Sequence, residues 1–174
     1  SINFPRDGLM ANISWSASRD ELGAEDEYDT FNINGLWAST WNKNTLMLWA
    51  GAAGVTNTDE PVNNGFSIGG LFNLSGYHES ELAGRYAGLI RFIYLRELGE
   101  SRSVLKIPVY AGISLEAGNV WDDRDDIAFD TLRTAGSLSL SMDSPLGPIY
   151  LARGFAENGR TENYLYLGRT FSFF

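Results

Sequence analysis

Residues 164–174 read YLYLGRTFSFF, and alternate positions in this stretch belong to two different faces. One set is apolar (Leu165, Leu167, Phe171 and Phe173), whereas the other set is mostly small or polar. A period of two residues is typical of a β-strand with one apolar face. A soluble sheet seldom leaves such an edge strand uncovered, because the strand invites aggregation. A closed membrane barrel pairs every strand and turns the apolar face to lipid, so this stretch favours a barrel.

The same alternation recurs along the whole chain and predicts eight strands. They cover residues 9–18, 31–40, 46–52, 82–95, 105–120, 129–142, 149–156 and 164–174. Residues 56–80 have no clear period and are expected to form a long loop. We find no linker and no second domain, so residues 1–174 are expected to form one all-β domain, an antiparallel eight-stranded transmembrane β-barrel of the up-and-down type.

The connections between these strands alternate in length and charge. Residues 42–44, 99–103 and 143–148 are short connections, whereas the other connections are longer and collect most of the acidic side chains. Short turns are typical of the periplasmic side of a barrel, and an even strand count would then put both termini there. Arg153 and Arg169 fall on apolar faces, where a charge near the membrane midplane would argue for a protein neighbour. The alternative is a soluble antiparallel sandwich, which also alternates but rarely turns so many polar side chains outward in phase.

Composition narrows the classes of function. The chain has 174 residues, a formal charge of -9 and no cysteine. The negative charge argues against a nucleic-acid partner, and the lack of cysteine excludes disulfides and thiolate metal sites. No apolar run approaches the ~20 residues of a membrane-spanning helix. The chain begins at Ser1 without a basic and apolar leader, so we expect a mature chain or an excised fragment.

Two local patterns partly match known reactive sites. Residues 65–69 match the G-x-S-x-G turn of hydrolases at Ser67, but that turn needs a helix after the strand, and His78 is the only histidine. The acidic run 122–126 lacks the regular spacing and final Glu of a calcium loop, so a solvated loop is the better interpretation. We therefore expect no enzyme activity, no catalytic residue, no metal site and no cofactor.

Four charged residues fall on the face of the strands that would line the lumen: Arg85, Arg91, Glu116 and Arg133. A turn centred near residues 100–101 would place Arg85 opposite Glu116, and a loop centred near Arg124 would place Arg133 opposite it. Charges in a narrow lumen need partners, so these residues are expected to form an ion network. Whether the network fills the barrel or forms a conduction or gating site stays open.

Several segments in order along the chain resemble the C-terminal half of the bacterial surface-antigen superfamily of outer-membrane barrels, which includes BamA, TamA and two-partner secretion transporters. Segments 4–8 and 144–148 resemble family turns, and 115–121 resembles a strand motif. Segment 69–77 resembles the loop that folds into the lumen and contacts that strand, with the motif Gly69, Gly70, Ser75, Gly76 and Tyr77. Residues 70–77 look most like the barrel of patatin-like type V secretion proteins.

This chain departs from the family pattern at two places. Ser75 stands where the family usually has arginine, and Ser114 and Glu116 stand where it has an aromatic residue and aspartate. On this basis Glu116 is expected to pair with Arg85 or Arg133. Family barrels have sixteen strands, so the chain is a fragment, closes alone, or pairs with a second copy as a homodimer.

The resemblance implies an outer-membrane anchor and translocator for an N-terminal passenger, for which a patatin-like phospholipase is expected. The last strand also resembles the signal that outer-membrane proteins present to the barrel assembly machinery; its residues are Tyr166, Gly168, Phe171, Phe173 and Phe174. The expected partners are therefore outer-membrane lipid and that machinery. The alternative function is a small structural or adhesive eight-stranded barrel of the OmpA or OmpX type.

Overall fold

The computed structural model describes residues 6–19, 27–57, 65–100, 107–144 and 147–168. These residues form ten strands: β1 (Gly8–Ser18), β2 (Tyr28–Trp41), β3 (Asn44–Thr56), β4 (Phe66–Ile68), β5 (Leu82–Gly84), β6 (Tyr86–Glu100), β7 (Pro108–Trp121), β8 (Arg133–Ser144), β9 (Gly147–Ala156) and β10 (Thr161–Leu167). Three single-turn 3₁₀ helices, η2 (Arg124–Asp126), η3 (Phe129–Thr131) and η4 (Glu157–Gly159), lie in the connections. Within the described ranges, no helix is long and apolar enough to cross a membrane.

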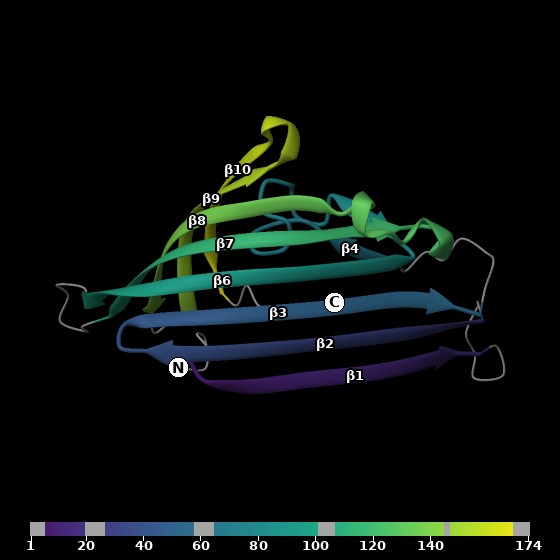
Figure 1. Cartoon of the computed structure of the whole chain (residues 1–174), viewed down its shortest axis with the longest axis horizontal. Helices are drawn as coiled ribbons and strands as arrows, with labels where there is room; N and C mark the ends of the chain where they lie inside the picture. The colour runs from purple at the N-terminus through teal and green to yellow at the C-terminus, as the bar shows by residue number, and fades with distance from the viewer. Residues whose placement is uncertain (1–5, 20–26, 58–64, 101–106, 145–146, 169–174) are drawn as a thin grey trace.

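Eight of the strands form one antiparallel sheet in the order β1-β2-β3-β6-β7-β8-β9-β10. The sheet curves strongly, so that β8, β9 and β10 turn back over the concave side (Figure 1). This confirms the predicted all-β, antiparallel architecture. In the described part of the chain β1 and β10 do not pair, so the predicted closure into an eight-stranded barrel is not observed.

The convex face of the sheet is covered by apolar side chains. Exposed apolar residues lie along both edges and the centre of the sheet, among them Leu9, Trp37, Phe92, Leu115, Leu140, Leu151 and Leu165. These are the faces that the alternation predicts to be apolar. Soluble proteins rarely expose a continuous apolar surface of this extent, so this face requires a nonpolar environment.

The concave face is buried by a segment of the chain itself. The connection between β3 and β6 enters the concave side and forms the small antiparallel sheet β4-β5. Between these two strands, residues 69–77 pack against the inner side chains of the main sheet, and their buried apolar members are Leu71, Phe72, Leu74 and Tyr77. The sequence predicts a loop over residues 56–80 and gives no sign of β4, whereas β5 falls at the start of the predicted strand 82–95.

Several predicted strand boundaries differ from the structure by a few residues, and at two of them the chain takes a different structure. The predicted strand 82–95 divides at Arg85, whose carbonyl accepts a hydrogen bond from the Val55 amide, so that β5 leaves the main sheet to pair with β4. Residues 129–131 form η3 instead of opening a strand, since the Thr131 and Leu132 amides close turns onto residues 128 and 129. The alternation of apolar and polar residues does not show where a strand changes its pairing partner, because β5 and β6 both keep the period of two residues.

Candidate functional site

Residues 69–77 fold into a compact turn whose shape depends on its surroundings. Phe72 and Leu74 both have positive φ angles, of 61° and 70°. This region is unfavourable for bulky side chains and persists where neighbouring groups hold it in place. Two hydrogen bonds close the turn, from the Gly70 amide to the Tyr77 carbonyl (3.1 Å) and from the Tyr77 amide to the Leu74 carbonyl (3.1 Å).

Glu116 of β7 binds this turn through Ser75. The Ser75 amide donates to Glu116 Oε2 (2.6 Å), and the Ser75 hydroxyl donates to Oε1 (2.7 Å). Ser75 Oγ also accepts a hydrogen bond from the Phe72 amide (2.9 Å), which supports the strained conformation of Phe72. Glu116 is only 4% exposed, so these bonds are made away from water, where they are strongest.

A chain of serine hydroxyl groups continues from Glu116 along the inner face. Ser114 Oγ donates to Glu116 Oε1 (2.5 Å) and lies 2.7 Å from Ser137 Oγ of β8. Because the Ser114 proton is used on Glu116, Ser137 is the donor in the second bond. The carboxylate therefore receives three hydrogen bonds from neutral groups.

Arg91 supplies the positive charge at this site. It is the cross-strand partner of Glu116, on β6, and is only 2% exposed. Its NH1 group donates to the Phe72 carbonyl (3.0 Å), and its guanidinium carbon lies 4.3 Å from the centre of the Trp49 ring. Adjacent strands thus present a carboxylate and a guanidinium side by side, and each group binds one residue of the turn.

The expected network around Glu116 has to be corrected. The register places Arg91 opposite Glu116 on β6 and Ala135 opposite it on β8, whereas Arg133 pairs with Gly118. Arg85 lies beyond this point, beside Asp122 and Asp123 at the end of the sheet. The error comes mainly from the assumed turn: Glu100 pairs with Pro108, so the connection between β6 and β7 is centred near residue 104 and not near residues 100–101, and the irregularity between Glu97 and Gly99 shifts the register by one residue only.

A second set of contacts joins the turn to the hairpin of β9 and β10. The Tyr164 hydroxyl donates to the Tyr77 carbonyl (2.9 Å) and accepts from the Gly76 amide (3.3 Å). The Tyr77 hydroxyl donates to Glu157 Oε1 (3.2 Å), at the tip of the hairpin. The turn is therefore attached to the last described strand as well as to β6 and β7.

Two arginines stack on the Tyr77 ring. The guanidinium carbons of Arg160 and Arg133 lie 4.5 Å and 5.7 Å from its centre. Arg133 NH1 also donates to the Tyr77 hydroxyl (3.2 Å), so Arg133 contacts the turn at Tyr77 rather than at Glu116. Arg160 in addition pairs with Glu81, at the start of β5.

Glycines let the backbone of the turn lie directly on β9. A Cβ atom on Gly154 would lie 2.6 Å from the Gly76 nitrogen, and one on Gly76 would lie 2.7 Å from the Ala156 nitrogen. Gly76 also has a φ of 106°, which disfavours other residues. No side chain fits between the two segments, and this explains the glycine of the loop motif.

The other sequence candidates do not converge on a reactive site. Ser67 lies in β4, which is followed by a turn and not by a helix, and His78 Nδ1 pairs with Glu162 (3.0 Å). Residues 124–126 form an exposed 3₁₀ turn, and no cluster of acidic and histidine side chains within the described ranges could hold a metal ion. Of the C-terminal signal, Tyr166 packs partly buried against the core, and Gly168 donates to the Pro148 carbonyl (2.9 Å). Phe171, Phe173 and Phe174 lie outside the described residues.

The sequence alone did not indicate Trp49, Ser137 or Tyr164 as site residues. Their only signal is that each falls on the inner face of its strand, a property that they share with many residues outside the site.

Comparison with protein families agrees with this geometry. The family model described as the Omp85 superfamily domain matches residues 1–173. The chain belongs to the Omp85 superfamily. Omp85 proteins are β-barrels of the bacterial outer membrane, so the apolar convex face of this chain meets lipid.

A solved structure shows the same fold. BamA from Haemophilus ducreyi, crystallised without POTRA domains 1–3, superimposes with a TM-score of 0.73 at 16% sequence identity. The match covers 94% of this Omp85 chain and 38% of the BamA chain, so this chain spans less than half of that protein. No curated protein is significantly similar in sequence.

Proposed function

We propose that this chain is the C-terminal part of an outer-membrane barrel that anchors a protein and translocates its N-terminal passenger. The observation that carries the proposal is the turn at residues 69–77, which Glu116 and Arg91 hold inside the concave face. A purely structural barrel can fill its interior with side chains of its strands alone. A separate segment, held through strained backbone and buried charges, is the kind of element that functional sites retain.

In the proposed arrangement the short connections and both chain ends face the periplasm. The connection between β2 and β3 is a tight turn at residues 42–43, and residues 145–146 join β8 to β9. Short turns of this kind are typical of the periplasmic side. The exposed acidic turn η2 then faces the outside of the cell.

The passenger that we propose is a patatin-like phospholipase. Support comes from the resemblance of residues 70–77 to the barrels of patatin-like type V secretion proteins. The chain itself would then be a non-enzymatic carrier. In the alternative function, a small structural or adhesive barrel of the OmpA or OmpX type, no passenger reaches the cell surface.

The test uses the full-length protein in its own cells. Protease added outside intact cells measures how much of the N-terminal passenger is at the surface, and heat-modifiable mobility measures folded barrel. We expect a surface-exposed passenger in the parent protein and about tenfold less in Glu116→Gln, because the neutral side chain leaves Arg91 without its buried counter-charge. Folded barrel should remain in the membrane.

Ser139→Ala is the matched control, since Ser139 is buried on the same face and its hydroxyl has no hydrogen-bond partner among the described residues. This variant should display the passenger normally. A parent protein whose N-terminal part stays in the periplasm would refute the translocator and favour the structural barrel. Normal display in Glu116→Gln would show that translocation does not need the contact with Ser75.

A further inference from the structure

The lipid-facing side of β8, β9 and β10 changes character along the strands. In one row of cross-strand partners, Leu140, Leu151 and Leu165 are 50%, 64% and 82% exposed. The next row toward the hairpin tip contains Leu138, Arg153 and Asn163, all of them exposed. An unbroken row of leucines is thus followed by a row with a cation and an amide.

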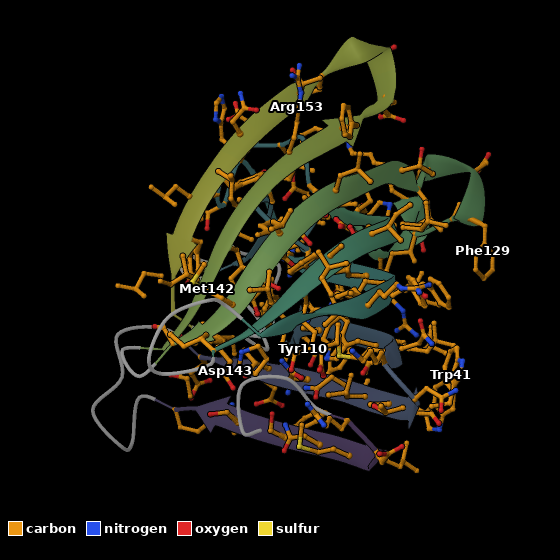
Figure 2. The ribbon with its side chains drawn as sticks, turned by 90° about the vertical axis from the view of Figure 1, so that its left-hand side faces the viewer. Trp41, Tyr110, Phe129, Met142, Asp143 and Arg153 are labelled. Carbon is orange, nitrogen blue, oxygen red and sulfur yellow. The ribbon has the colours of Figure 1, made fainter. Side chains whose placement is uncertain are left out.

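Arg153 points away from the sheet, on the side opposite the concave face (Figure 2). Its guanidinium carbon lies 5.7 Å from the ring centre of Phe155, two positions further along the same face. Asn163 of β10 is its direct cross-strand partner. The two side chains therefore present hydrogen-bond donors side by side on a surface that is otherwise apolar.

The depth of Arg153 in the membrane follows from strand geometry. Arg153 lies three residues before Ala156, the last residue of β9. With a rise of about 3.3 Å per residue and a tilt of about 40°, it is roughly 8 Å below the end of the strand at the hairpin tip. That position is in the half of β9 nearer the hairpin tip. A long arginine side chain can reach from there toward the headgroups, where an exposed charge is least costly.

We propose that Arg153 and Asn163 bind the phosphate group of a phosphorylated glycolipid in the outer leaflet. The guanidinium forms two parallel hydrogen bonds to phosphate oxygens, and the Asn163 amide donates a further one. The leucine row packs against the acyl chains of the same molecule. This site is separate from the inner turn and does not depend on translocation.

The surroundings select a lipid over other occupants. A free phosphate ion would gain nothing from the exposed leucines, whereas a lipid places its phosphate directly above an apolar tail. A protein neighbour would bring an acidic side chain, but the exposed residues around Arg153 are apolar or neutral, with no second charge to specify one. These residues are Leu138, Leu151, Phe155, Thr161 and Leu165.

The test measures lipid binding to the full-length protein, purified in detergent, by native mass spectrometry. The probes are diphosphorylated lipid A, the same lipid without its phosphates, phosphatidylglycerol and inorganic phosphate. We expect lipid A to bind at least tenfold more tightly than the dephosphorylated form. Arg153→Leu should weaken this binding about tenfold, Asn163→Leu should weaken it less, and Arg153→Lys should retain part of it, because a point charge lacks the planar fork.

Arg96→Leu is the matched control, since Arg96 is an exposed arginine on the same face of β6 but near the short-turn end. Its lipid A binding should equal that of the parent. Unchanged binding in Arg153→Leu, or equal binding of dephosphorylated lipid, would overturn the proposal. The proposal would also be overturned if phosphatidylglycerol bound as tightly as lipid A, or if millimolar inorganic phosphate competed with lipid A. Loss of binding in Arg96→Leu alone would overturn it as well. So would photo-crosslinking from position 153 to protein instead of lipid.

Discussion

The contact between Ser75 and Glu116 shows how a neutral residue replaces a charged one at a buried site. The family pattern places arginine before the motif glycine, where this chain has Ser75. Here the positive charge comes from Arg91 on the neighbouring strand, and it binds the same turn at the Phe72 carbonyl. Ser75 contributes hydrogen bonds but no charge. The charge therefore comes from Arg91, and the hydrogen bonds to Glu116 come from Ser75.

Ser75→Ala tests the hydrogen-bonding half of this arrangement. The change removes one donor to Glu116 and the acceptor of the Phe72 amide, which leaves buried polar groups unsatisfied. We expect the free energy of unfolding to fall by about 1–3 kcal/mol. Denaturant titration of the folded barrel measures it, with Ser139→Ala as the variant that should change stability little. If Ser75→Ala and Ser139→Ala lowered the free energy of unfolding by the same amount, the hydrogen bonds of Ser75 would not have the role assigned to them.

Gly154→Ala tests the close approach of β9 to the turn. The added methyl group would lie 2.6 Å from the Gly76 nitrogen, so the turn must move. Overpacking of this kind costs roughly 1–3 kcal/mol. Gly35→Ala on β2 is the control, because its nearest neighbour would be the Met10 carbonyl oxygen at 3.7 Å, an ordinary contact. Thermal unfolding of both variants should show a lower midpoint for Gly154→Ala alone.

At the scale of elements, the turn connects strands that lie apart in the sheet. It contacts β6 and β7 through Arg91 and Glu116, and it contacts the β9–β10 hairpin through Tyr164. Beside it, Arg160 of the hairpin pairs with Glu81 at the start of β5. The small β4–β5 unit is thereby attached to the far part of the curved sheet.

The Glu81 contact makes part of this attachment dependent on pH. The His78 amide, which donates to Glu81 Oε2 (2.8 Å), and then Arg160 hold the pKa of Glu81 below its usual range. A carboxyl group with a lowered pKa stabilises the folded state at pH values above its ordinary pKa of about 4.3. This stabilisation is lost as the pH falls through the lowered pKa.

Glu81→Gln should therefore lower the unfolding midpoint slightly at pH 7, and this difference from the parent should become smaller at pH 3, as the carboxylate is protonated. Glu79→Gln, at an exposed position two residues away, should have no effect at either pH. Thermal unfolding followed by circular dichroism measures the four differences. A Glu81→Gln effect of the same size at pH 3 would mean that the carboxylate charge is not involved.

At the scale of the whole molecule, the sheet has two edges that do not meet in the described residues. β1 is exposed along nearly its whole length, including inner-face residues such as Met10 and Asn12. Unpaired edges in a membrane are costly, since no water satisfies their backbone groups. The β1 edge therefore needs a partner strand.

We expect the isolated 174-residue chain, refolded in detergent, to associate as a homodimer in which the edges of two copies pair. Light scattering corrected for bound detergent should give twice the mass of one chain. The physical reason is that a sixteen-stranded ring satisfies both pairs of edges. A folded monomer would show instead that β1 and the end of the chain close onto each other.

The sequence by itself determined the eight strands of the main sheet, the faces of most of them, and the family. A period of two is a local property, so Leu115 and Glu116 on β7, or Leu140 and Ser141 on β8, can be assigned to opposite faces without knowledge of their neighbours. On β9 the faces were ambiguous, because Arg153 falls on the same side as Leu151. The inward loop could also be predicted, because its motif resembles that of a known family.

Only the tertiary structure decided which residues meet. Register depends on bulges and connection lengths, and the longer connection between β6 and β7, with Glu100 paired to Pro108, brings Arg91 opposite Glu116 in place of Arg85. The contacts of Tyr77 with Arg133, Arg160 and Tyr164 join residues more than 50 positions apart in the sequence. Such contacts arise from the curvature of the whole sheet, and no local pattern encodes that curvature.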